Sequence, residues 1–488
     1  MNILFIYPDI MGYSLFKGNY YNGLASLSAA IKEKTPHRVE LLHLKKAIKK
    51  EDFLLKIEEA DTDLVAFTST ANMFGFVRQW SNWVKEYNKD LKTICGGAHA
   101  TICPEEVINN SGIDMVCVGE GEDSLLELSD KLHSGININD IEGLWVKDKN
   151  NIHKNKVRPL ISDLDTLALP DRGIFDYSNL HSESQGRATI MVSRGCPYNC
   201  AYCCNLALRK ATTDNPADYV RFKSVPTVMF ELKDILKKYS FVKEFAFDDD
   251  ILPLDINWFR QFAKEYKKEI TMPYDCNLRP NLVNEEIVTL LKDSGCYQIR
   301  MGIESGSEHI RNKVMQRHIS QQQLVKAFEL CKAHGLRIFT FNMIGLPYEN
   351  LSMTLDTVKL NSQLKSEINQ VTIFYPYKNT RLYEICEQEG LIVKNKMVTH
   401  YAKDTILNFN LYRRNQLKFI QRYFRVLVKF YKFLERHPKS KAIFEKSLFS
   451  RVSSLTILPV FNLVFMVIWN NNMLSRLARS INRRFLRG

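Results

Sequence analysis

The chain has 488 residues, of which 45% are hydrophobic and 25% are charged, so it can form two to four globular domains. Its eleven cysteines are too sparse for a disulfide scaffold, and most lie in apolar runs, which is typical of a reducing cytoplasm. The first eight residues contain no basic region and no cleavage site, so we expect a buried strand there rather than a signal peptide.

The net charge of +13 is concentrated at one end of the chain. Residues 401–488 contain 18 Lys and Arg against 3 Asp and Glu, whereas the rest of the chain contains 49 against 51. The basic character therefore belongs to the C-terminal segment and not to the body of the protein.

Residues 1–130 alternate short apolar runs with amphipathic stretches such as Gly23–Lys32 and Phe76–Asn88. Strands are expected at Ile3–Tyr7, Arg38–Leu42, Leu64–Thr68, Thr93–Cys95 and Met115–Val118. Apolar strands separated by helices predict a parallel sheet covered on both faces. Five such units predict an α/β fold of the flavodoxin-like, doubly wound type for residues 1–130.

Three loops follow the third, fourth and fifth predicted strands, at the edge where doubly wound domains bind ligands. The candidate binding residues in these loops are Thr68, Ser69, Thr70, Gly96, Gly97, His99, Gly119, Glu120 and Gly121. Paired glycines let the backbone approach a bulky ligand closely. We therefore expect a ligand at this edge, and His99 is either one of its contacts or an ordinary loop histidine.

Residues 131–187 are predicted to be a linker that contains a hairpin around the polar turn at 148–151. The alternation of strands and helices resumes in residues 188–399. Strands are expected at Ala188–Ser193, Glu244–Asp249, Tyr274–Leu278, Gln298–Ile303, Ile338–Ile344 and Gln370–Tyr375. Six such units predict a partial (β/α)6 barrel, in which functional groups lie at the C-terminal ends of the strands.

The first of these strands leads into the sequence Cys196-Pro-Tyr-Asn-Cys200-Ala-Tyr-Cys203. Three thiolates at this spacing can converge on an iron–sulfur cluster or on zinc. A structural zinc site usually has a fourth Cys or His, and the adjacent Cys204 is poorly placed, because neighbouring residues rarely point to one centre. A cubane held by three thiolates leaves one iron open for chemistry. A disulfide or zinc loop is the alternative.

This spacing, with Tyr202 before the last cysteine, resembles the signature of the radical SAM enzymes. The resemblance implies that Cys196, Cys200 and Cys203 hold a [4Fe–4S] cluster and that Cys204 does not. It implies that the open iron binds S-adenosylmethionine (SAM), which is cleaved reductively to a 5′-deoxyadenosyl radical. It also implies an external electron donor of the flavodoxin or ferredoxin type.

The three glycine-containing loops of residues 1–130 resemble the cobalamin-binding domain that precedes many radical SAM domains. The nine loop residues named above are then the expected cobalamin contacts. Such domains often carry D-x-H-x-x-G, whose histidine ligates cobalt, but Pro8-Asp9-Ile10-Met11-Gly12 has no histidine at that place. The resemblance therefore implies cobalamin bound base-off, without a histidine lower ligand. A degenerate domain that no longer binds cobalamin is the alternative.

Polar residues also follow the later barrel strands. The resemblance assigns SAM contacts to Tyr202, Asp249, Arg279, Glu304, Ser305 and Gly345. Asp249 is preferred among the three aspartates of 248–250 because it alternates with two phenylalanines, and the SAM ammonium requires a carboxylate partner. We expect Asp249 and Glu304 to serve SAM binding rather than folding. A solvated acidic turn is the alternative for the aspartates.

Residues 400–488 lie outside the resemblance and are predicted to be helical. Residues 416–435 interleave aromatic and aliphatic side chains with Lys and Arg, as a basic amphipathic helix does. Val452–Trp469 is a mostly apolar run of marginal length for a membrane span. The segment is a helical cap on the barrel, a contact with an anionic membrane surface, or a transmembrane span. No recognition motif favours nucleic acid.

Together these features predict a cobalamin-dependent radical SAM enzyme. The resemblance favours a methyltransferase that uses two SAM molecules, one as the methyl source for cobalamin and one as the radical source, on an unactivated carbon of a small-molecule or lipid-type substrate. One alternative is a non-methylating cyclase or rearrangement enzyme. Another is a non-catalytic cobalamin or iron–sulfur sensor. We expect a cytoplasmic protein, with peripheral attachment at the inner face of the membrane as a further possibility.

Overall fold

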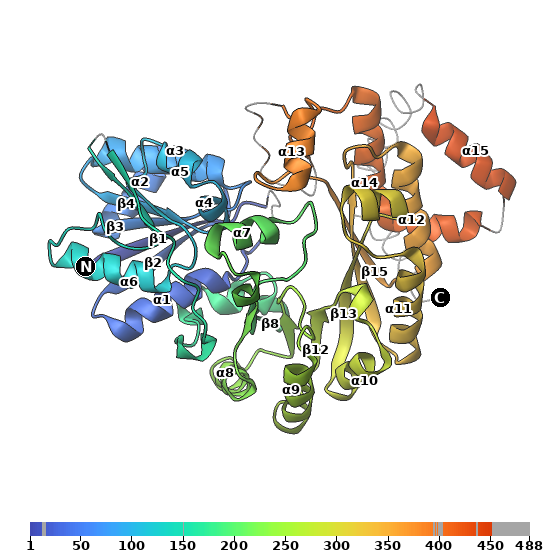
Figure 1. Cartoon of the computed structure of the whole chain (residues 1–488), viewed down its shortest axis with the longest axis horizontal. Helices are drawn as coiled ribbons and strands as arrows, with labels where there is room; N and C mark the ends of the chain where they lie inside the picture. Colours follow the sequence, from blue (N-terminus) through green and yellow to red (C-terminus); the bar gives the residue numbers. More distant parts are fainter. Residues whose placement is uncertain are drawn as a thin grey trace, which may run out of the picture.

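Two α/β bodies lie side by side in the computed structural model, with the N-terminal body in blue and cyan and the second in green and yellow (Figure 1). The structure describes residues 1–11, 16–149, 151–393, 396, 398, 404–435 and 438–450. The helices that follow the second body lie at the end of the molecule remote from the N-terminal sheet.

The N-terminal body is built on a seven-stranded sheet in the order β2-β1-β3-β4-β5-β6-β7. Its strands are β1 (Asn2–Pro8), β2 (Arg38–Leu44), β3 (Leu64–Thr68), β4 (Lys92–Gly96), β5 (Met115–Cys117), β6 (Leu144–Asp148) and β7 (Asn151–Lys154). Its helices are α1 (Asn22–Lys34), α2 (Lys50–Glu59), α3 (Phe74–Tyr87), α4 (Ala98–Ile102), α5 (Pro104–Ile108) and α6 (Glu122–His133). The first five strands are parallel in the order 2-1-3-4-5, which confirms the flavodoxin-like fold.

The predicted linker at 131–187 begins as part of this sheet. The hairpin of β6 and β7 is present, but β6 pairs antiparallel with β5, so the sheet extends beyond residue 130. An unpaired edge would expose backbone polar groups, and the hairpin covers the edge of β5. The rest of the segment contains four short 3₁₀ turns, at Leu164–Thr166, Arg172–Ile174, Tyr177–Asn179 and Glu183–Gln185.

The second body contains the predicted six-stranded parallel sheet, in the order β15-β14-β13-β12-β11-β8. Its strands are β8 (Arg187–Ile190), β11 (Glu244–Phe247), β12 (Tyr274–Asn277), β13 (Cys296–Glu304), β14 (Arg337–Ile344) and β15 (Ile368–Ile373). Its helices are α7 (Cys204–Thr212), α8 (Val225–Lys238), α9 (Ile256–Glu269), α10 (Glu285–Asp293), α11 (Gln321–Ala333), α12 (Leu351–Leu364) and α13 (Arg381–Gln388). A separate pair, β9 (Ser193–Arg194) and β10 (Arg221–Phe222), follows β8.

Local sequence fixes where the barrel helices begin. Helices α8, α9, α10 and α11 each start after a polar residue whose side chain accepts a backbone N–H of the first turn: Ser224, Asp255, Asn284 and Ser320. Their apolar faces then pack on the sheet, where Phe245, Phe247 and Tyr274 are fully buried. Burial of such large side chains contributes roughly 2–3 kcal/mol each, which anchors the strand ends that carry the site.

The first helix of the basic tail, α14 (Leu411–Leu434), packs on the barrel beside α12 and β15. Its buried face includes Leu417, Ile420, Phe424 and Tyr431, all at most 2% exposed. Of the three interpretations of the tail, the packing of α14 matches a helical cap on the barrel. It is followed by α15 (Pro438–Phe449), and the apolar run Val452–Trp469 lies outside the described residues. Within the described part of the chain, no helix is long and apolar enough to cross a membrane.

Candidate active site

The three motif cysteines lie in the loop between β9 and α7. Cys200 is buried, and Cys196 and Cys203 are partly exposed. Arg279 donates a hydrogen bond to Cys200 Sγ at 3.3 Å, and the amide of Asn205 lies 3.7 Å from Cys203 Sγ. N–H groups directed at sulfur stabilise thiolates and are typical of iron–sulfur sites, so this donor set fits a cluster held by three cysteines.

Arg279, a predicted SAM contact, follows β12, and its side chain packs against the cysteine loop. Its guanidinium stacks 3.8 Å above the Tyr198 ring and also donates to the backbone carbonyl of Arg317. With a further hydrogen bond to Asn281 Oδ1 at 2.8 Å, three contacts hold its side chain, which is 7% exposed, against Cys200. The sequence placed Arg279 near the site through its strand-end position but did not indicate its contact with sulfur.

Tyr202 and Glu304, two more predicted SAM contacts, meet beside this loop. The Tyr202 hydroxyl donates to Glu304 Oε1 at 3.3 Å, and Arg317 donates to the Tyr202 oxygen at 2.5 Å. Burial raises the pKa of the Glu304 carboxyl, and nearby Arg317 opposes that shift. Glu304 has a φ of +65°, an uncommon backbone conformation for a residue with a side chain, which is often found at functional sites. Adjacent Ser305 is fully buried.

Asp249 lies fully buried at the end of β11, where it joins this strand to the end of β8. Its Oδ1 accepts hydrogen bonds from the backbone of Val192 and Ser193, at 2.9 and 2.6 Å, and from the Ser193 hydroxyl. Burial raises its pKa to about 6. Asp249 Oδ2 and Asn277 Oδ1 have no hydrogen-bond partner among the described residues, so two acceptors remain for a donor such as an ammonium. These contacts give Asp249 a structural role beside its expected contact with SAM, which stays a prediction.

Asp249→Ala should lower the free energy of unfolding by about 1–3 kcal/mol, because three buried donors lose their acceptor. Asp248→Ala is the matched control, since Asp248 is half exposed and pairs with Arg300 near the surface, where an ion pair contributes little. Urea unfolding of both variants measures the difference. Equal stability of the two would show that the Asp249 contacts do not support the fold.

Gly345, the last predicted SAM contact, follows β14 with a φ of +79°. Its amide donates to Glu349 Oε2 at 2.5 Å, and the amide of Leu346 donates to the same oxygen at 3.2 Å. Glu349 is 2% exposed, and burial raises its pKa to about 7. The Gly345 amide is therefore already paired with Glu349, a residue that sequence analysis did not single out.

Glu349→Gln should make the protein relatively more stable as pH rises. Because burial raises its pKa to about 7, the contribution of Glu349 to wild-type stability is fully present below about pH 4.5, where the unfolded carboxyl is still protonated, and is lost as pH rises through 7, where the buried carboxyl ionises. The variant keeps an acceptor oxygen but cannot ionise, so its advantage over wild type should grow by about 3 kcal/mol between pH 4 and pH 9. Urea unfolding across this range tests the expectation, with exposed Glu308→Gln as control. A difference that is independent of pH would contradict it.

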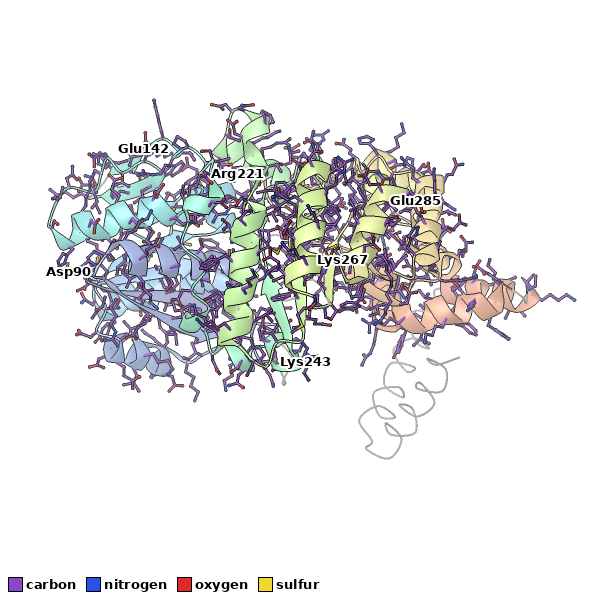
Figure 2. All side chains as sticks on the ribbon, turned by 90° about the horizontal axis from the view of Figure 1, so that it is seen from below. Asp90, Glu142, Arg221, Lys243, Lys267 and Glu285 are labelled. Atoms are coloured by element: carbon purple, nitrogen blue, oxygen red, sulfur yellow. The ribbon has the colours of Figure 1, made fainter. Side chains whose placement is uncertain are left out.

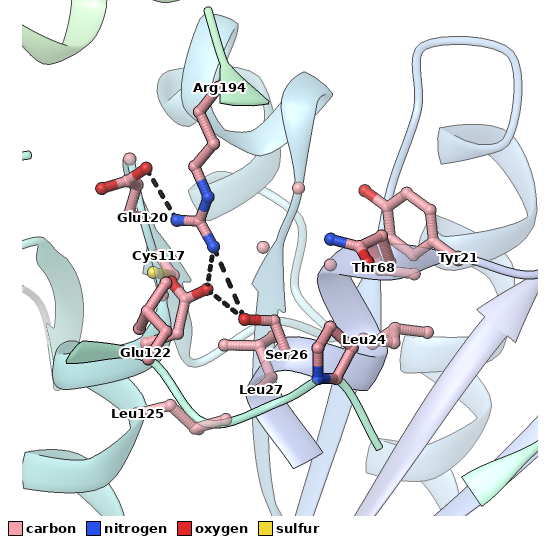
Figure 3. Close-up of a pocket in the computed structure, with 18 of the residues that line it drawn as sticks. Tyr21, Leu24, Ser26, Leu27, Thr68, Cys117, Glu120, Glu122, Leu125 and Arg194 are labelled. Carbon is pink, nitrogen blue, oxygen red and sulfur yellow. Dashed lines mark hydrogen bonds and ion pairs between the residues drawn. The ribbon is translucent and has the colours of Figure 1, made fainter. Parts of the chain in front are cut away.

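A cavity of about 400 Å³ opens between the two bodies (Figure 3). Of the predicted cobalamin contacts, Thr68, Gly96, Gly97, Gly119, Glu120 and Gly121 line it, whereas Ser69, Thr70 and His99 do not. A Cβ on Gly97, which has a φ of +94°, would lie 2.9 Å from Ser69 O and from Thr68 Oγ1. Gly97 thus lets the loops after β3 and β4 pack closely together, so that backbone forms this part of the wall, which fits close contact with a large flat group.

The opposite wall comes from α1 and from residues 191–194 of the barrel. Arg194 pairs with Glu120 at 2.7 Å and with Glu122 at 2.6 Å, and Ser26 donates to Glu122 at 2.7 Å (Figure 3). Burial opposes ionisation of Glu120, but Arg194 and Arg221 outweigh it and lower the pKa of Glu120. Sequence analysis missed Arg194, which stands two residues before Cys196 and therefore joins the cavity wall to the cysteine loop.

Arg221 lies at the boundary between the two bodies (Figure 2). It binds Glu120 at 2.9 Å and the carbonyl of Ile161 at 2.8 Å, so it connects β10, the glycine loop and the predicted linker. Residues from three separate parts of the chain thereby fix the position of the cavity relative to the cysteine loop.

Histidines lie away from this cavity in the described structure. His99 is buried against Phe74, and His43 pairs with Asp9 at 2.9 Å. No histidine belongs to the described cavity lining. His99 is therefore not a contact of the described cavity.

Comparisons with known proteins identify both bodies. A model of the B12 binding domain matches residues 19–129, and a model of the radical SAM superfamily matches residues 190–360. The protein is a radical SAM enzyme with a B12-binding domain. Its cofactors are a [4Fe–4S] cluster, SAM and cobalamin.

Similar proteins have names that refer to methyl transfer or to cobalamin-dependent radical SAM chemistry. An uncharacterized methyltransferase of Pyrococcus horikoshii is 28% identical to this radical SAM enzyme over 81% of the chain and 84% of its own length. The structure resembles the radical SAM methyltransferase TsrM of Kitasatospora setae with cobalamin and cluster bound, with a TM-score of 0.64 and 15% identity, over 81% and 79% of the two chains. It also resembles the cobalamin-dependent radical enzyme OxsB, with a TM-score of 0.68 and 15% identity, over 99% and 75%. At these identities the two structures establish the shared fold.

Proposed function

We propose that this enzyme transfers a methyl group to an unactivated carbon of a small-molecule or lipid-type substrate. The observation that carries the proposal is one shared cavity whose walls include both the glycine loops and Arg194, two residues before the cysteine motif. A group held on the glycine loops and a group held by the cysteines would then face a common space. Methyltransferase names among the relatives support the same reaction class.

The proposed ligands follow from the contacts described above. Cys196, Cys200 and Cys203 hold the cluster, and the glycine loops of β3, β4 and β5 hold cobalamin. When bound, these groups supply one-electron reduction and methyl transfer. Tyr202, Glu304 and Arg279 form the polar wall that orients SAM, and the orphaned acceptors of Asp249 and Asn277 offer a place for its ammonium.

The apolar part of the cavity supports exclusion of water from the reaction. Leu24, Leu27 and Leu125 line one side, and Met191 and Leu208 line the barrel side. A radical or a methyl group in transit reacts with solvent and stray donors unless the site is closed to them. The same lining favours a substrate with an apolar reacting portion.

Isotope transfer tests the reaction class. The reconstituted enzyme is given SAM with a deuterated methyl group, a reductant of the flavodoxin type and a metabolite extract from cells. Methyl transfer predicts formation of both S-adenosylhomocysteine and 5′-deoxyadenosine, with the label in a product. A non-methylating enzyme would give 5′-deoxyadenosine without label transfer, and a sensor would give neither. Cys200→Ala, which removes one cluster ligand, is the background control.

We also propose that the basic C-terminal segment attaches the enzyme to an anionic membrane surface. The support is the excess of 15 positive charges in residues 401–488, together with exposed Val426 on α14 and Ile443 on α15, at 57% and 70%. Each engaged Lys or Arg contributes on the order of 1 kcal/mol at such a surface. The buried face of α14 is not available for this contact, because it packs on the barrel.

Full-length protein should float with vesicles that contain anionic lipid and should release as salt approaches 1 M, where screening is nearly complete. A chain that ends at residue 450 keeps the α14 cap and should float less, because it lacks the last basic residues. Vesicles of neutral lipid are the control. If the two chains float equally, residues 451–488 do not contribute to membrane attachment, and the proposal is wrong for that segment.

A further inference from the structure

Three metal-binding side chains converge outside the cavity, on the two short helices that follow the Gly96–Gly97 loop. They are His99 on α4, Cys103 between the helices and Glu106 on α5. One ligand atom from each lies within 4.8 Å of the others. The spacings of four and three residues are each about one helical turn, so the chain brings all three to the same side.

The buried His99 imidazole has a ring nitrogen that forms no hydrogen bond. It is 6% exposed and packs against Phe74 in a tilted arrangement, with 4.6 Å between ring centroids. Its Nε2 lies 3.4 Å from Glu106 Oε2 but forms no hydrogen bond with any described residue. Buried polar atoms in proteins almost always have a hydrogen-bond partner, so this nitrogen, whose ion-pair contact with Glu106 is long, can accept a further ligand within this group of three side chains.

We propose that His99, Cys103 and Glu106 bind one divalent transition-metal ion of the zinc type. Nitrogen, sulfur and carboxylate oxygen form a donor set that suits Zn²⁺, and three protein ligands leave a fourth position for water. Cys103, which is 8% exposed, binds as the thiolate, and its proton passes to solvent. None of the three side chains lines the cavity described above.

The site lies where the two bodies meet. Lys378, in the turn after β15, pairs with Glu106 at 2.8 Å, and adjacent Asn379 donates to the carbonyl of Ile102 at 2.6 Å. Lys378 and His99 Nε2 both contact Oε2 of Glu106, which leaves its Oε1 for the ion. Because α4 begins directly after Gly97, the ion fastens the cavity wall to the barrel through these contacts.

Metal analysis of the holoenzyme tests the site. Protein with its full iron and cobalt content is equilibrated with buffered Zn²⁺, and element analysis counts zinc separately from iron and cobalt. Wild type should bind about one zinc per chain, and Cys103→Ser and His99→Gln should bind at least tenfold more weakly. The matched controls are Glu105→Gln, next to Glu106 but paired with Lys154, and His334→Gln on the surface of the barrel. Both controls should bind zinc as wild type does.

X-ray absorption at the zinc edge of the wild-type holoenzyme gives a test that needs no variant. The proposal predicts one sulfur at about 2.3 Å and lighter ligands at about 2.0 Å. A zinc with no sulfur ligand, or with several, would place the ion elsewhere and overturn the assignment. Failure of wild type to bind zinc, or equal binding by Cys103→Ser, would overturn it too.

Discussion

The triple variant Cys196→Ala, Cys200→Ala and Cys203→Ala should contain no [4Fe–4S] cluster. About four irons per chain and the brown absorbance should be lost together, because no other described residues offer thiolates in that loop except Cys204. SAM cleavage should fall to background, since no open iron remains to bind and reduce it. Iron analysis and detection of 5′-deoxyadenosine measure the two losses.

Cys204→Ala provides the matched control for this experiment. Cys204 is the first residue of α7 and stands next to Cys203, so we expect it to lie outside the cluster. This variant should keep its iron and its SAM cleavage. Full iron content in the triple variant would contradict the assignment, and loss of iron in Cys204→Ala would add a fourth residue to the cluster site.

Gly97→Ala should weaken cobalamin binding by more than tenfold. The added Cβ would meet the backbone oxygen of Ser69 and the Thr68 hydroxyl at 2.9 Å, and a φ of +94° is strained for any residue with a side chain. Both effects force the β3 and β4 loops apart at the wall where the corrin is expected. Absorbance titration with cobalamin measures the affinity, and the melting temperature reports damage to the fold.

Gly135→Ala separates backbone strain from the effect at the cavity. Gly135 also has a positive φ, of +66°, but a Cβ there meets nothing within 4 Å, and it lies after α6 away from the cavity lining. This control should lose some stability and keep its cobalamin affinity. If both variants bind cobalamin as tightly as wild type, the Gly97 loop is not part of the cobalamin site.

Several features were readable from sequence because they depend on residues close together in the chain. Alternation of apolar runs and amphipathic stretches predicted the parallel strands of both sheets, with β13 and β14 placed to within two residues at their ends and the end of β8 placed three residues too late. The cysteine motif predicted a metal site for the same reason, since one loop of eight residues contains all three thiols. The glycines at the ends of β4 and β5 indicated the cavity wall, because their spacing after a strand is a local pattern.

The ion-pair and hydrogen-bond partners of charged residues could not be predicted from local sequence patterns. Arg194 contacts Glu120 and Glu122, more than 70 positions away, and no periodicity links them. Arg317 reaches Tyr202 across 115 positions, and Asp249 binds the backbone of Val192 across 57. The folding role of Asp249 was missed because only the pairing of β11 with β8 brings these atoms together.

The cysteine motif, the two α/β bodies and the glycine loops were therefore determined by the sequence alone. The tertiary structure decided that the hairpin of β6 and β7 joins the first sheet, that α14 caps the barrel, and that His99 turns away from the cavity. Local propensity sets which segments become strands and helices. Which surfaces they bury, and which charges they pair, depends on contacts between distant parts of the chain that form only when the whole protein packs.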